Sequence, residues 1–167
     1  MPFLVYVGVL ALGALVEATI GHRLELGGGR PNVVLLLVVA WGLLRGIEEG
    51  ALAGLLGGLA LDLVSGTPFG LHTAILGLLG ALGALGGATH HPGTLGLLSR
   101  AVLTTVAYHG AGVLVLQALG WEMPSFSRLI STLVPTVLIN AALSPIVFSL
   151  AQRLFRALSG WRQLEVE

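Results

Sequence analysis

The amino-acid sequence predicts an all-α fold, a polytopic membrane bundle of about six transmembrane helices in one domain over residues 1–167. Only 10% of the residues are charged and 55% are hydrophobic, whereas soluble domains carry about 25% charged residues. Apolar runs occupy nearly the whole chain, and each membrane crossing needs about 20 such residues. Six crossings would therefore use most of the sequence and leave only short loops.

Turn residues separate the predicted helices, which cover about residues 3–21, 31–45, 49–64, 68–87, 97–119 and 129–150. The second and third are short for a complete crossing, so whether this hairpin spans the bilayer fully stays open. Before the fourth helix, Thr67 would act as the cap and Pro68 would occupy the first turn.

The positive charges are all arginines, and they set the expected orientation. An amino terminus in the cytoplasm would place five of them inside, namely Arg45, Arg100, Arg153, Arg156 and Arg162. It would place three outside, namely Arg23, Arg30 and Arg128. Cytoplasmic loops carry an excess of Lys and Arg, so both termini are expected in the cytoplasm. The tail 151–167, with Trp161 among its arginines, favours either an amphipathic segment at the lipid headgroups or simple charge anchoring.

Glycines recur at four-residue spacing in the third and fourth predicted helices. Gly50, Gly54 and Gly58 form one series, and Gly83 and Gly87 form another. Small residues at this spacing let two helix backbones approach closely in a membrane. The pattern predicts either internal helix packing or a face for a partner's helix.

Ionisable side chains within membrane helices are costly unless they are paired. In the expected topology, Glu17, Asp62 and His72 all lie towards the external side, together with Arg23 and Arg30. They would form either an ion-pair and capping cluster or a polar pocket for a ligand. Asp62 in particular could accept N–H groups from the first turn of the following helix.

The sixth predicted helix contains Pro135 and Pro145, with Asn140 between them. Each proline frees the backbone carbonyl four residues earlier and should bend the helix. Asn140 is therefore expected to bond a freed carbonyl or a neighbouring helix.

Several function classes have no support in the sequence. The chain has no cysteine, so disulfides and thiolate chemistry are excluded. Metalloprotease, serine-hydrolase and nucleotide-binding motifs are absent, and no basic patch favours nucleic acid. The pair His90-His91 lacks further metal ligands nearby. We therefore expect no enzyme activity, no cofactor and no metal.

The stretch from Arg30 to Leu71 resembles the MreD family of bacterial rod-shape-determining membrane proteins. Pro31-Asn32 opens an apolar segment, and a glycine-rich segment follows that reads GLLGGLALDLVSGTPFG. Five residues match the signature of the family, namely Asp62, Gly66, Pro68, Phe69 and Gly70. The last helix also fits the family, because Asn140 stands five residues before Pro145. The loop His90-His91-Pro92 departs from the family pattern.

The resemblance implies a role in the cell-elongation complex of the bacterial inner membrane. Such proteins act with MreC, a single-span protein, and in a complex that contains MreB, a RodA-type glycosyltransferase and a class B penicillin-binding protein. The family is similar in fold to the substrate-binding components of energy-coupling-factor transporters, so capture of a small molecule such as a vitamin is the alternative function. Membrane lipid is the other expected contact, and self-association stays open.

The structural or partner-binding candidates are Glu17, Pro31, Asn32, Asp62, Gly66, Pro68, Phe69, Gly70, His72, Asn140 and Pro145.

Overall fold

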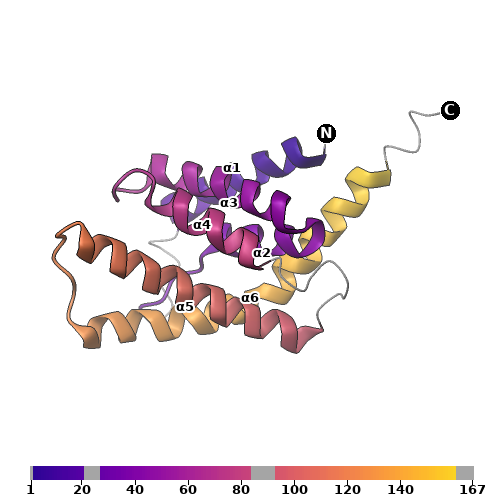
Figure 1. The fold of residues 1–167 in the computed structure, drawn as a ribbon. Helices are drawn as coiled ribbons and strands as arrows, with labels where there is room; N and C mark the ends of the chain where they lie inside the picture. Colours follow the sequence, from indigo (N-terminus) through magenta and orange to yellow (C-terminus); the bar gives the residue numbers. More distant parts are fainter. Residues whose placement is uncertain (1, 21–26, 84–92, 161–167) are drawn as a thin grey trace.

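The computed structural model describes residues 2–20, 27–83 and 93–160. These residues form six helices and no strand, in the order α1 (Pro2–Ile20), α2 (Val33–Arg45), α3 (Ile47–Val64), α4 (Leu71–Gly83), α5 (Thr94–Ala118) and α6 (Phe126–Gly160) (Figure 1). The predicted all-α class is thus confirmed for the described part of the chain. Seven residues discussed above lie outside it, namely Arg23, Gly87, His90, His91, Pro92, Trp161 and Arg162.

Several helix boundaries differ from the predicted ones, and helices α3, α5 and α6 begin two to three residues earlier than expected. Helix α2 begins at Val33 and not at residue 31, and Pro31 and Asn32 belong to the loop before it. Helix α4 begins at Leu71 and not at residue 68, so the predictions that Thr67 caps it and that Pro68 occupies its first turn are both wrong. Helix α6 continues to Gly160, well beyond the predicted end at residue 150.

Helix α2 is the centre of the core. Nine of its 13 residues are buried, and it contacts each of the other five helices. At 1.5 Å per residue it is only about 20 Å long, shorter than the hydrocarbon layer of about 30 Å. The composition of α2, almost purely apolar with no polar face, fits a helix that is surrounded by other helices.

An aromatic cluster packs around one end of α2. Trp41 is 1% exposed and stacks on Tyr6 with ring centroids 3.9 Å apart. Phe155 of α6 meets the Trp41 ring edge-on at 6.1 Å. The Tyr6 hydroxyl donates a hydrogen bond of 2.7 Å to the Leu37 carbonyl, which ties α1 to α2. Among the described residues the Trp41 indole N–H has no hydrogen-bond partner.

Helices α3 and α4 form the tightest pair, and glycine is the reason. A Cβ added at Gly54 would lie 2.0 Å from the Leu76 carbonyl oxygen, and one at Gly58 would lie 2.5 Å from that of His72. A Cβ at Gly50 would lie 2.5 Å from the Gly80 carbonyl oxygen. The series at residues 50, 54 and 58 therefore serves internal packing, and of the two interpretations the partner-helix face is wrong for these three glycines.

Helices α5 and α6 run side by side over much of their length, and α6 then changes direction (Figure 1). Pro135 and Pro145 both lie inside α6, and a proline inside a helix bends it by removing a backbone hydrogen bond.

The described residues contain two helices that are long and apolar enough to cross a membrane, α5 and most of α6. Helices α1, α2 and α4 are apolar but shorter. Large apolar side chains are exposed along α5 and α6, with Leu103 69% and Leu138 66% exposed. Such surfaces are typical of a protein that meets lipid, so the structure indicates a membrane protein.

Candidate functional site

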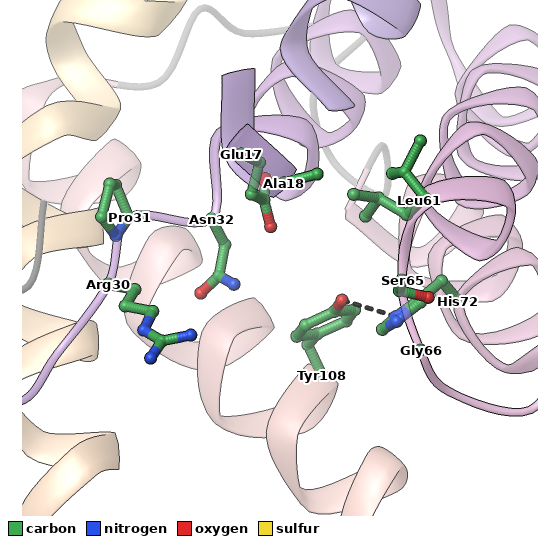
Figure 2. Close-up of a pocket in the computed structure, with 11 residues that line it drawn as sticks. Glu17, Ala18, Arg30, Pro31, Asn32, Leu61, Ser65, Gly66, His72 and Tyr108 are labelled. Carbon is green, nitrogen blue, oxygen red and sulfur yellow. Dashed lines mark hydrogen bonds between the residues drawn. The ribbon is translucent and has the colours of Figure 1, made fainter. Parts of the chain in front are cut away.

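A cavity of about 340 Å³ opens where the end of α1, the loop before α2, the turn between α3 and α4, and α5 meet (Figure 2). We call it the polar cavity. It is lined by Glu17, Ala18, Arg30, Pro31, Asn32, Leu61, Val64, Ser65, Gly66, His72 and Tyr108. Arg30 and Asn32 lie on one side of it and His72 and Tyr108 on the other (Figure 2). Tyr108 is near the middle of α5, so the cavity lies at mid-length of that helix.

Asp62 holds the turn beneath this cavity. Its carboxylate accepts hydrogen bonds from the backbone N–H groups of Gly70, His72 and Thr73, at 3.0, 2.9 and 3.0 Å. The Thr73 hydroxyl donates a fourth bond of 2.5 Å. These N–H groups belong to the start of α4 and would otherwise lack partners.

The expectation that Asp62 accepts N–H groups from the first turn of α4 is thus confirmed, although that turn lies three residues later than predicted, because α4 begins at Leu71 and not at residue 68. The turn can close in this way because Gly70 has a φ of +95°, which glycine adopts without strain. Thr67 is not the cap, because α4 begins four residues later at Leu71 and the Thr67 hydroxyl bonds Ser65 and His72 instead.

Glu17 acts in the same manner at the start of α2. Its carboxylate accepts a hydrogen bond of 3.0 Å from the Val34 N–H, one of the free groups of the first helical turn. A negative charge is favourable at this end of a helix. The two carboxylates near the cavity are therefore both engaged with helix starts, one for α2 and one for α4.

Asn140 joins α6 to the loop before α2. Its amide oxygen accepts the Asn32 N–H at 2.9 Å. Its amide nitrogen donates to the Asn32 side-chain oxygen at 2.9 Å and to the Thr105 hydroxyl at 3.0 Å. Asn140 is fully buried, so these three bonds satisfy a polar group that lipid could not solvate. The expected contact with a neighbouring helix is confirmed.

The loop before α2 touches α6 a second time, one turn earlier. The Arg30 N–H donates to the Thr136 hydroxyl at 3.1 Å. A Cβ on Gly29 would lie 2.5 Å from the Thr136 nitrogen, so only glycine allows this approach. Pro135 and Asn140 therefore mark the part of α6 on which the loop rests.

His72 is held by both of its ring nitrogens. One forms a hydrogen bond of 2.7 Å with the Tyr108 hydroxyl and the other one of 3.1 Å with the Thr67 hydroxyl. Thr67 in turn bonds the Ser65 hydroxyl at 2.8 Å. The chain of bonds runs from the α3–α4 turn to the middle of α5 and orders one wall of the polar cavity.

The structure brings most of the candidate residues together. Glu17, Pro31, Asn32, Gly66 and His72 line the polar cavity. Asp62, Gly70 and Asn140 hold the segments that form it. Pro68, Phe69 and Pro145 do not line it, and Phe69 is 71% exposed.

Three contributors were missed by the sequence analysis. Tyr108, which lines the polar cavity, and Thr73 and Thr105, which bond Asp62 and Asn140, are not among the candidates drawn from the sequence. The sequence did contain a signal for Thr105. It lies three residues before Tyr108, so the two polar side chains share one face of α5. Within the described ranges no three His, Cys, Asp or Glu residues are grouped as metal ligands would be.

Comparison with known protein families shows that residues 1–157 match the family model described as rod shape-determining protein MreD. No curated protein and no solved structure matches the chain. The similarity to transporter substrate-binding components thus has no support from solved structures.

Proposed function

The chain belongs to the MreD family of rod shape-determining proteins, and from this premise we propose that it is a non-enzymatic membrane scaffold that binds MreC in the cell-elongation complex. The family match over residues 1–157 is the observation that carries the proposal, and it supports a role in rod shape determination. Binding of MreC, and through it an influence on peptidoglycan synthesis by the glycosyltransferase and the penicillin-binding protein, is the finer step that we add.

The arrangement of polar groups supports a scaffold. Asp62 and Glu17 accept hydrogen bonds from the starts of α4 and α2, and Asn140 donates one to the loop before α2. Groups used in this way fix the positions of helices. Leu, Val and Ile side chains are exposed on α5 and α6, so these two helices are available for van der Waals packing with another membrane helix.

Affinity purification from membranes tests the proposal. A tagged chain expressed at its native level should recover an MreC-type partner at a fixed ratio, and deletion of the gene should cause loss of rod shape. The matched control is a tagged membrane protein of similar size from outside the complex. Recovery of the chain without partner, together with normal cell shape after deletion, would contradict the proposal.

We further propose that the chain crosses the inner membrane several times with both termini in the cytoplasm. The native chain has no cysteine, so single cysteines report accessibility cleanly. Phe69→Cys, at an exposed position, should react with an impermeant maleimide from outside. Gly93→Cys, where an added Cβ meets nothing within 4 Å, should react only after the membrane is opened. The reverse result would overturn this orientation.

Capture of a small molecule is the second candidate, and the polar cavity is the observation that favours it. Its volume of about 340 Å³ lies within the range of small-molecule sites, about 300–1,000 Å³. Phe69 does not fill it, since that side chain is exposed. A vitamin that co-purifies at one per chain would support this candidate. Vitamin uptake that is unchanged after gene deletion would contradict it.

A further inference from the structure

The walls of the polar cavity carry both signs of charge. The carboxyl group of Glu17 points into the open space from the end of α1, and the guanidinium of Arg30 lies on another side, with Asn32 between them (Figure 2). The cavity is also lined by three apolar side chains, those of Ala18, Leu61 and Val64. A ligand that fills the cavity therefore meets a negative acceptor, a positive donor and an apolar surface.

Both charged groups have hydrogen-bonding capacity for a ligand. The Glu17 carboxylate accepts the Val34 N–H at 3.0 Å and also interacts with the Asn32 amide and the Val33 N–H. A carboxylate has about four acceptor sites on its two oxygens, so one remains for a further donor. A guanidinium has about five N–H donors in a planar fork. Arg30 can therefore bind a carboxylate through two of them and retain its other contacts.

The position of the cavity in the fold favours a ligand that arrives from water. The end of α1, the start of α2 and the end of α3 meet at the cavity, and all three face the outside in the orientation proposed above. Tyr108 lies ten residues before the last residue of α5, Ala118, which is about 15 Å along the helix axis. The cavity thus lies below the outer end of α5, at a depth where a charged ligand needs groups of opposite charge around it.

From these observations we propose that the polar cavity binds one small zwitterion of the amino-acid class from the external side. Arg30 binds its carboxylate, Glu17 binds its ammonium group, and the carbon skeleton lies against Leu61 and Val64. Each charge of the ligand meets an opposite charge, and the ligand adds no net charge, which limits the cost of burying it in the membrane. A simple anion would lie near Glu17 and a simple cation near Arg30, so each would meet a like charge. This inference rests on the second candidate function above, capture of a small molecule, and names its ligand class.

Binding is measured on the purified full chain in detergent, by the rise in its melting midpoint. The probes are the standard protein amino acids, each tested separately, with glycylglycine and triglycine as zwitterions of wider charge separation. We expect at least one of them to raise the midpoint, as a ligand of the folded state does. The N-acetyl derivative of that probe lacks the ammonium charge, and its carboxamide lacks the carboxylate. Each derivative should bind about tenfold or more weakly than the probe itself.

Two variants that remove a charge assign the two ends of the ligand. Glu17→Gln keeps an acceptor for the Val34 N–H but loses the negative charge, so it should no longer prefer the probe over the N-acetyl derivative. Arg30→Gln should lose the preference over the carboxamide, and each variant should retain the other preference. Glu122→Gln and Arg128→Gln are the matched controls, because both residues are exposed and neither lines the cavity.

Gly66→Leu tests the space of the cavity independently of its charges. Gly66 lines the cavity and an added Cβ there meets nothing within 4 Å, so a larger side chain should narrow the cavity and weaken binding by about tenfold or more. Gly110→Leu is the control, because its added Cβ also meets nothing within 4 Å and Gly110 does not line the cavity. Circular dichroism shows whether each variant is folded, and if the charge variants are not, this pair and the two derivatives decide.

Three results would overturn the proposal. Equal binding of the probe and both derivatives would show that the charges of the ligand are not recognised. Binding that is unchanged in Gly66→Leu would place the site elsewhere on the chain. Absence of binding by every zwitterion would refute the amino-acid class, and binding of riboflavin in the same assay would then leave capture of a small molecule standing.

Discussion

Replacement of Asp62 by leucine should destabilise the α3–α4 hairpin strongly. Asp62 is 5% exposed, and Asp62→Leu leaves four donors without their acceptor, three of them N–H groups at the start of α4. Each unsatisfied buried donor costs about 1–3 kcal/mol, while removal of a buried charge recovers part of the loss. We expect a net loss of about 3 kcal/mol, within the range for a broken buried network, about 3–5 kcal/mol.

Thermal unfolding in detergent measures this loss. For a chain of this length 1 kcal/mol shifts the melting midpoint by about 2–4 °C, so Asp62→Leu should lower it by about 6–12 °C. Asp62→Asn keeps one strong acceptor and should lose about 1–2 kcal/mol. Leu63→Ala, on the exposed side of the same turn of α3, is the matched control and should change little.

The outcome also separates architecture from direct function. A melting midpoint for Asp62→Leu within about 1 °C of the wild type would refute the reasoning, because the capping bonds would then contribute almost nothing. If that stable variant also failed to restore rod shape in a deletion strain, the carboxylate would have a direct functional role. Rod shape and stability that are lost together are the result we expect.

The other predictions use the same melting assay. Asn140→Leu removes three hydrogen bonds at a fully buried position and should cost about 2–4 kcal/mol, so an unchanged midpoint would contradict the proposed link between α6 and the loop before α2. Gly54→Ala places a Cβ 2.0 Å from a carbonyl oxygen of α4 and should cost about 3 kcal/mol or more, whereas Gly110→Ala, in open space, should be neutral or gain up to about 1 kcal/mol in helix propensity. Arg45 and Glu49 form an ion pair one turn apart, and Glu49→Gln should cost about 0.5 kcal/mol or less; a larger loss would show that the pair does more than a surface contact.

Asp62 illustrates how far local reasoning reaches. The sequence shows that a carboxylate stands inside a membrane helix, where an unpaired charge is costly, and that it lies just before the start of the next helix. Both observations predicted that it caps that helix, as it does. The helix was expected to start at residue 68, too early for its true donors at Gly70, His72 and Thr73, because the sequence does not show that Gly70 turns the chain at a φ of +95°. Thr67 was taken as the cap for the same reason, since its residue type is right and only the path of the turn excludes it.

The glycine series illustrates the opposite case. Four-residue spacing predicts a close helix contact, but both a neighbouring helix of the same chain and a partner's helix would satisfy it. The answer depends on which helix faces Gly54, and the structure shows that it is α4. Spacing defines a face of a helix, and only the fold determines what covers that face.

By itself the sequence determined the helical class, the apolar surface, the resemblance to the MreD family and the polar residues that needed partners, because these depend on composition, on periodicity and on the cost of burying charge. The tertiary structure decided which partners those residues found. Asn32 and Asn140, or His72 and Tyr108, are far apart in the chain and meet only after helices pack. A hydrogen bond within one helix is set by residue spacing, whereas a bond between helices depends on where each helix lies, and that position results from the packing of the whole bundle.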